Sequence, residues 1–169
     1  MVKTHVHIIK TGGTIEFLDP AYEEMNTKIM KLDASIESYL NHLIKPHFTF
    51  SIEAVLEKDS RDINEADRVK IAKAVEASPY TNIIITHGTF TMRQTAEFLE
   101  QYLSSIDKKV ILTGSMIPVT GFAASDAGFN LGFVIASFAQ LSPGIYLSMN
   151  GGVFKSNEVA KNEALFRFE

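Results

Sequence analysis

The chain has 169 residues, and its hydrophobic content of 46% is enough to fill the core of one domain, residues 1–169, without stabilisation by metal ions or disulfide bonds. Its 16 basic and 20 acidic side chains give a net charge of -4, and because they form no basic cluster, nucleic acid is not an expected partner. The absence of cysteine excludes disulfide bonds and thiolate metal sites, and no apolar run approaches the roughly 18 residues of a membrane span, so we expect a cytoplasmic protein without a membrane partner.

A short strand and a glycine turn precede a segment without periodicity. The apolar residues Val6, Ile8 and Ile9 predict the strand. The TGGTI turn follows, in which Gly12 and Gly13 permit backbone conformations that other residues resist. Residues 16–30 then predict a loop or a short hairpin.

Two helices flank the second predicted strand. Positions 36–44 predict the first helix, which Asp33 or Ser35 can cap and which Lys45-Pro46 ends. Residues 48–56 alternate as a strand does, and the second helix follows the EKDSRDI turn.

The remainder of the chain alternates apolar strands with helical patterns. The strand at 83–85 is apolar on both faces, as expected for a central strand of a parallel sheet. The other predicted elements are a helix containing residues 96–103, a strand at 109–112, a long loop, a helix within 125–141, a strand at 145–149 and a hairpin at 150–154.

Strands separated by helices at this spacing predict right-handed crossovers and a sheet with helices on both faces. We therefore expect a doubly wound, mostly parallel α/β fold of the Rossmann or flavodoxin-like kind, with a C-terminal β-hairpin. Ligands of such sheets bind beyond the carboxyl ends of the strands. Three polar turns, TGGT, DSRD and HGT, should meet there.

Threonines follow two of these strands, and each has two interpretations. Thr14 lies either in an ordinary Gly-Gly turn or at a strand end where its hydroxyl attacks an amide carbonyl once a base removes its proton. Thr89 either caps the following helix or faces the same site. Two threonines at neighbouring strand ends are more indicative of a site than either alone.

The remaining chemistry-bearing residues indicate no cofactor. Lys161, in NEVAKNE, is either a solvated lysine or, if buried, a base that accepts a hydroxyl proton. The five histidines show no metal-ligand spacing. TGGT lacks the GK[ST] of a phosphate loop and is not GxGxxG. We expect no metal and no nucleotide.

Five motifs occur in a characteristic order. They are TGGTI, DSRDI, THGTFTM, VILTGSMIPVTGFAASDAGFNL and YLSMNGGVFKSNEVAKN. In this order the chain resembles the L-asparaginases of the bacterial and archaeal type, specifically their N-terminal domain. The resemblance implies hydrolysis of a side-chain amide in two steps. A threonine is first acylated with loss of ammonia, and water then attacks the acyl group.

The resemblance also implies roles for individual residues. Thr14 corresponds to the nucleophile, and Tyr22 to the loop tyrosine that accepts its proton. Thr89 and Lys161 correspond to the second threonine and its lysine partner. Ser60 is implied to hold the substrate carboxylate. The implied substrate-binding positions are Gly13, Asp59, Ser60, Arg61, Gly88, Phe90 and Ser115.

Phe90 is the first departure from the family pattern. The family carries an aspartate there, which binds the α-ammonium group of the substrate, and phenylalanine cannot pair with that charge. A desolvated ammonium without a partner costs roughly several kcal/mol, so free asparagine should bind poorly. The ring then covers an uncharged or acylated part of a different amide, or the site has ceased to turn over.

The second departure is length. The family has a smaller C-terminal domain that contributes an acidic residue to the active site of a neighbouring subunit, whereas this chain stops at FRFE. Either it is a natural one-domain member that builds its cleft between identical subunits, as a homodimer or larger homo-oligomer, or it is an excised domain whose cleft is open. Arg61, where the family often has glutamine or a small polar residue, could contact a substrate carboxylate in place of the missing group.

Two functions of different classes follow. The first is an asparaginase-like amidohydrolase that acts on a small carboxylate-bearing amide without a free α-amino group. The second is a catalytically inactive module that keeps the cleft and binds a small ligand or a partner chain. Both threonines and Lys161 favour catalysis, whereas Phe90 and the missing second domain favour the module.

Overall fold

The computed structural model describes residues 4–16, 35–117 and 125–169. The strands of its main sheet are β1 (His5–Lys10), β2 (Thr49–Ala54), β3 (Asn82–Thr86), β4 (Lys109–Thr113), β5 (Gly144–Met149) and β6 (Gly152–Phe154). The helices are α2 (Ile36–Ser38), α3 (Glu65–Ala77), α4 (Met92–Tyr102) and α5 (Ala127–Ser137), with short segments η1 (Thr14–Glu16), η2 (Tyr39–Ile44), η3 (Ser60–Asp62) and η4 (Ser156–Glu158). Two short strands, β7 (Lys161–Asn162) and β8 (Arg167–Phe168), follow.

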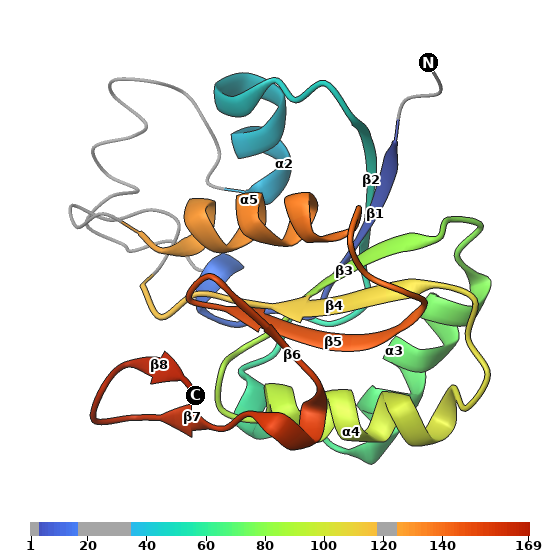
Figure 1. The fold of residues 1–169 in the computed structure, drawn as a ribbon, viewed down its shortest axis with the longest axis vertical. Coiled ribbons are helices and arrows are strands. Elements are labelled where there is room, and N and C mark those ends of the chain that lie inside the picture. Colours follow the sequence, from blue (N-terminus) through green and yellow to red (C-terminus); the bar gives the residue numbers. More distant parts are fainter. Residues whose placement is uncertain (1–3, 17–34, 118–124) are drawn as a thin grey trace.

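The described residues form a six-stranded sheet in the order β2-β1-β3-β4-β5-β6 (Figure 1). β1 to β5 are parallel, and β6 pairs antiparallel with β5. This order confirms the predicted doubly wound, mostly parallel α/β fold. The direction of winding reverses between β1 and β3, and ligands of such sheets bind beside the carboxyl ends of the strands at this point. The TGGT and HGT turns follow these two strands.

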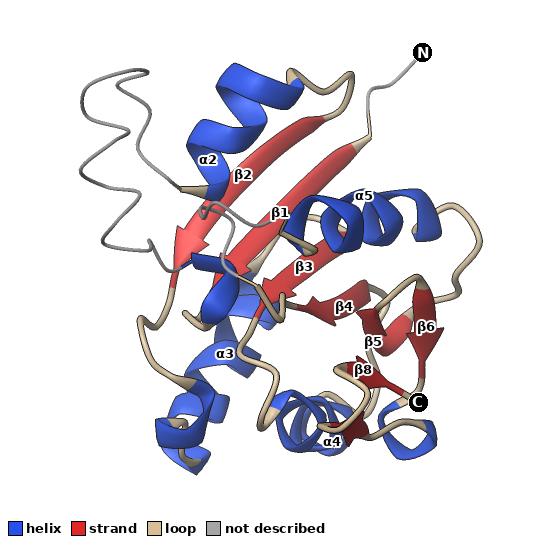
Figure 2. Ribbon diagram, turned by 90° about the vertical axis from the view of Figure 1, so that its left-hand side faces the viewer, coloured by secondary structure: helices blue, strands red, loops and turns tan. Residues whose placement is uncertain are grey.

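Helices cover both faces of the sheet. α2 and α5 lie over one face, and α3 and α4 over the other (Figure 1 and Figure 2). Within β3, Ile83 and Ile85 pack with side chains of α3 and α4, whereas Ile84 packs with those of α2 and α5. Because successive strand residues point to opposite faces, one short apolar strand contributes to both layers of the core.

The predicted helix at 36–44 is confirmed, but only its first turn is α-helical. Ser35 caps it through its side chain, while Asp33 lies outside the described residues. The chain continues as the π-helix η2 and ends at Lys45, whose φ of 49° is left-handed. Pro46 disfavours helical angles at the preceding residue, so the helix stops where the sequence predicts.

The C-terminal hairpin is followed by a separate strand pair. Asn150 and Gly151, with φ of 54° and 78°, form the tight turn from β5 to β6, so the predicted hairpin is confirmed. β7 and β8 pair antiparallel with each other. Val159 and Phe168 bury their side chains in the core cluster that contains α3 and α4 residues. These contacts hold β7, which carries Lys161, against the body of the protein.

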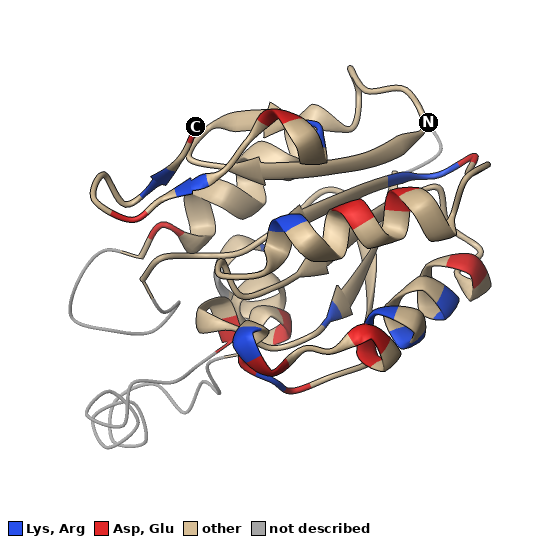
Figure 3. Cartoon of the chain, turned by 90° about the horizontal axis from the view of Figure 1, so that it is seen from below, with Lys and Arg blue, Asp and Glu red and all other residues tan. Residues whose placement is uncertain are grey.

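Charges of both signs are interspersed along the described elements (Figure 3). α3 alone carries acidic and basic residues within its 13 positions. Among the described helices, none has the length and apolar character that crossing a membrane requires.

Phe168→Ala should detach the β7–β8 pair from the core. Phe168 is 4% exposed, and removal of a buried phenylalanine ring costs about 3–5 kcal/mol, so the midpoint of urea unfolding should fall. Phe166→Ala is the matched control, because that ring is 71% exposed in the same segment. The control should change the free energy of unfolding by less than about 0.5 kcal/mol. Equal effects of the two substitutions would contradict the anchoring role of Phe168.

Candidate active site

Three turns at the carboxyl edge of the sheet are in direct contact. A Cβ atom placed on Gly13 of the TGGT turn would lie 2.4 Å from the Gly88 amide nitrogen of the HGT turn. A Cβ atom on Gly88 would lie 2.6 Å from Ser60 Oγ in the DSRD turn. Thr91 donates its hydroxyl proton to the Ser60 carbonyl at 2.6 Å. The turns that the sequence predicts to share one edge therefore pack directly on one another.

The backbone conformations of Gly12 and Gly13 position Thr14 at the start of the short helical segment η1. Gly12 and Gly13 have φ of 100° and 85°, which residues with side chains rarely adopt. A Cβ atom on Gly12 would also lie 2.4 Å from the carbonyl oxygen of Lys58. Thr14 follows as the first residue of η1 and is half-buried, one residue away from the contact with Gly88.

Several hydroxyl groups near these turns are buried. Thr89 is 6% exposed, and the N-cap position of α4 is Thr91, so helix capping does not account for Thr89. Ser60 Oγ and Ser115 Oγ have no hydrogen-bond partner within the described part of the chain. Because buried hydroxyl groups are nearly always hydrogen-bonded, these two have capacity for a ligand or a water molecule.

His87 supports the HGT turn as a neutral side chain. Complete burial lowers its pKa to about 4, so it is uncharged near pH 7. Its Nδ1–H donates to the Gly88 carbonyl at 2.8 Å, which leaves Nε2 to accept from the Thr95 hydroxyl at 2.9 Å. Arg68 donates to the same hydroxyl at 3.2 Å. His87 thus has a structural role in the core.

Lys161 and Arg61 both contact the ring of Phe90, which is 47% exposed. The Lys161 ammonium nitrogen lies 3.7 Å from the ring centroid, and the Arg61 guanidinium carbon lies 4.9 Å from it. Asp59 accepts hydrogen bonds from the Arg61 side chain, which lower the pKa of Asp59 to about 2. Among the described residues, Lys161 has neither a carboxylate partner nor the hydrogen bond to Thr89 that its predicted role calls for.

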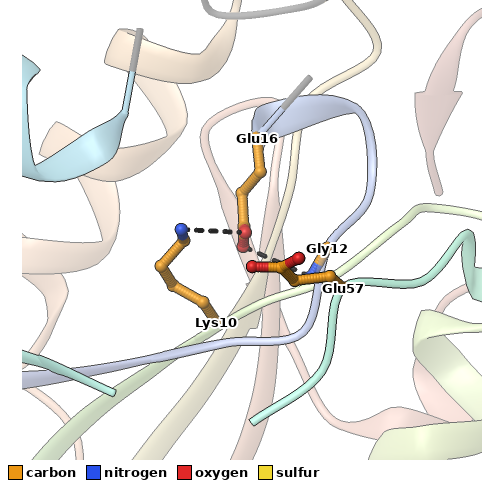
Figure 4. A pocket seen from close by; sticks show the side chains of 4 residues that line it. All are labelled: Lys10, Gly12, Glu16 and Glu57. Atoms are coloured by element: carbon orange, nitrogen blue, oxygen red, sulfur yellow. Dashed lines mark hydrogen bonds and ion pairs between the residues drawn. The ribbon is translucent and has the colours of Figure 1, made fainter. Parts of the chain in front are cut away.

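Glu16 carries a largely buried carboxylate that sequence reasoning missed. Its Oε1 accepts hydrogen bonds from the Thr86 hydroxyl and, at 3.4 Å, from the Gly12 amide. Its Oε2 lies 3.4 Å from the Lys10 ammonium nitrogen (Figure 4). Burial nevertheless raises the pKa of Glu16. A cavity of about 340 Å³ lies beside it, lined by Lys10, Gly12, Glu16 and Glu57. The acidic residue directly after the glycine turn was the available signal in the sequence.

Two further predictions concern a loop tyrosine and metals. Tyr22 lies outside the described residues. Within the described ranges, no three histidine, cysteine, aspartate or glutamate side chains are grouped as a metal ion requires. The described groups at this edge that can act on a ligand include hydroxyls, backbone amides, carboxylates and the two cations at Phe90.

Glu16→Gln should change how stability depends on pH. Because the pKa of Glu16 is raised in the folded protein, the folded state binds its proton more tightly than the unfolded state does. The stability that this group contributes is present at low pH and is lost as pH rises through its folded pKa. The variant should therefore gain stability relative to the unsubstituted protein as pH rises, in denaturant titrations from pH 4 to pH 8. Glu57→Gln removes one negative charge from the exposed carboxylate of the same cavity and is the matched control. Parallel pH profiles for Glu16→Gln and the unsubstituted protein would refute this account.

Comparison with known proteins agrees with this geometry. A family model described as Asparaginase, N-terminal matches residues 5–167. L-asparaginase 2 of Escherichia coli (strain K12) is 30% identical over 164 residues, covering 93% of this chain and 46% of the relative. The L-asparaginase of Thermococcus kodakarensis is 36% identical over 160 residues, covering 94% and 48%. The crystal structure of L-asparaginase I from Vibrio cholerae matches with a TM-score of 0.78 at 28% identity, covering 99% of this chain and 51% of that chain.

The chain thus spans about half the length of the relatives it matches. The match nevertheless extends over almost all of this chain, in sequence and in fold, and it includes all three turns described above. This chain belongs to the asparaginase family.

Proposed function

We propose that this chain is an asparaginase-like amidohydrolase that releases ammonia from a small amide bearing a carboxylate. The observation that carries the proposal is the direct packing of the TGGT turn on the HGT turn, because these turns carry Thr14 and Thr89. Membership of the asparaginase family supports the same class of reaction.

The proposed reaction uses Thr14 as the nucleophile. The Thr14 hydroxyl oxygen attacks the amide carbonyl carbon, and its proton passes to Tyr22. The C–N bond then breaks, the nitrogen takes up a proton and leaves as ammonia, and an ester on Thr14 remains. Water attacks the ester carbonyl, the acid product leaves, and the Thr14 oxygen regains a proton. Thr89, with Lys161 as its cationic partner, stabilises charge at the reacting centre.

The substrate carboxylate is assigned to Ser60. The hydroxyl group of Ser60 is buried, has no partner within the described residues, and lies against Gly88. Gly13 and Ser115 complete the lining of the proposed site. Asp59 and Arg61 flank Ser60 in the sequence and contribute charges of opposite sign.

Free asparagine is expected to be a poor substrate. Phe90 offers no carboxylate to an ammonium group, and the cations Lys161 and Arg61 lie over its ring. Placing an ammonium group against two cations is unfavourable, in addition to the lost ion pair. An amide without a free α-amino group avoids both costs.

The proposed domain organisation, location and oligomeric state are those expected from the sequence. Residues 1–169 form one domain, the protein works in the cytoplasm, and copies of the chain associate as a homodimer or larger oligomer. The chain spans about half the length of the relatives it matches, and the proposed association of copies would bring further surface close to the site.

A second function is favoured by one observation. Lys161 lies over the ring of Phe90 and is not hydrogen-bonded to Thr89 among the described residues. A catalytically inactive module that binds a small ligand, or that serves as a subunit of a larger assembly, would not need that hydrogen bond.

An assay of ammonia release distinguishes the amidohydrolase from the inactive binding module. We expect release from succinamate or from N-acylated asparagine, with slower release from asparagine and glutamine. Thr14→Ala should lower kcat/KM on the best substrate by on the order of 10³-fold, because the attacking oxygen is removed. Thr14→Ser keeps a hydroxyl group and is the matched control, which should retain measurable activity. Melting temperatures of both variants establish that they are folded.

The nucleophile assignment is wrong if Thr14→Ala releases ammonia at the unsubstituted rate. If no amide is hydrolysed, and calorimetry shows that the same compounds bind equally well to Thr14→Ala, the binding module is the better description.

A further inference from the structure

We propose that Lys161, Phe90 and Arg61 form an anion-binding subsite, and that the preferred ligand carries a second carboxylate beside the one held by Ser60. For a substrate, this means an amide with two carboxylates on neighbouring or identical carbon atoms. The catalytic part of this inference rests on the proposed function, whereas the binding part does not.

The exposed ring of Phe90 gives the subsite its shape. Lysine and arginine both lie over this ring, at 3.7 Å and 4.9 Å from its centroid, although it is 47% exposed. A cation over an aromatic face is held by the quadrupole of the ring, and its N–H groups that point away from the ring stay free to donate. The ring therefore orients two cationic groups while leaving donors available to an anion.

Lys161 supplies the uncompensated charge of the subsite. Arg61 is paired with Asp59 through two side-chain hydrogen bonds, of 3.0 Å and 2.9 Å, so its charge is balanced. Lys161 has no carboxylate partner among the described residues. A carboxylate that approaches the ring would form a charge-assisted hydrogen bond with Lys161 and balance its charge.

The subsite is close to the proposed reacting groups. Phe90 follows Gly88 by two residues, and Gly88 contacts both Gly13 and Ser60. Arg61 is the neighbour of Ser60, whose buried hydroxyl has no partner within the described residues. One small ligand can therefore place one carboxylate at Ser60 and another at Lys161.

A second lysine over an aromatic ring provides a control. Lys155 lies over Tyr146, with its ammonium nitrogen 3.9 Å from the ring centroid. Tyr146 is only 8% exposed, so this ring does not form an open surface. Lys155→Met removes the same charge from the same kind of contact without touching the proposed subsite.

The test compares three acids that differ at a single carbon. Aspartate carries an ammonium group at this carbon, succinate carries hydrogen, and ethane-1,1,2-tricarboxylate carries a third carboxylate. Isothermal titration calorimetry with the unsubstituted protein should give the lowest Kd for the tricarboxylate, on the order of tenfold below that for succinate, and the highest Kd for aspartate. Lys161→Met should reduce the ratio between tricarboxylate and succinate to below about threefold, whereas Lys161→Arg and Lys155→Met should preserve it.

The subsite is ruled out if the tricarboxylate binds no tighter than succinate, if none of the acids binds, or if Lys161→Met leaves the ratio unchanged. These outcomes are independent of ammonia release. Tight, Lys161-dependent binding without hydrolysis of any amide would retain the subsite and reject the hydrolase. Thr14-dependent hydrolysis without tighter binding of the tricarboxylate would retain the hydrolase and reject the subsite.

Discussion

The candidate site depends on the contact between Gly13 and Gly88, where no side chain fits. β1 and β3 are adjacent and parallel, with Lys10 paired to Thr86, so the turns that follow them start at the same level. A Cβ atom at position 13 would lie 2.4 Å from a backbone nitrogen, which cannot move away as a flexible side chain can. Any larger residue there must separate the turns, and with them Thr14 and Thr89. The sheet brings the turns to one edge, and the glycines let them touch.

Hydrogen bonds of two polar side chains stabilise this contact, one in the segment after β1 and one in the segment after β3. Glu16 accepts hydrogen bonds from Gly12 and from the end of β3, and His87 donates to the carbonyl of Gly88. Burial disfavours the charged form of each group, lowering the pKa of the histidine and raising that of the glutamate. Their contribution is to hold backbone groups in fixed positions, which a site must do before any chemistry is efficient.

The fold was predictable because its signals are local, whereas the position of the key side chains was not. An apolar run such as 83–85 identifies a central strand by itself, and the glycine pair identifies its turn. The burial of Glu16 depends on Thr86, which is 70 residues away in the sequence, and no periodicity reports such a pairing. Lys161 is carried by a strand of two residues, and distant packing of Phe168 and Val159 determines where it lies.

The contact between Lys161 and Phe90 also bears on which residue can move a proton. A lysine that accepts the hydroxyl proton of a threonine must first lose its own, whereas a lysine that binds an anion must keep it. An aromatic face favours the charged form of an ammonium group placed over it, because the ring presents negative potential there. The Lys161 ammonium nitrogen lies 3.7 Å from the Phe90 ring centroid, a geometry that suits an anion-binding role. In the proposed reaction, proton acceptance from Thr14 then falls to a group other than Lys161, and the cations over the Phe90 ring offer positive charge to the ligand.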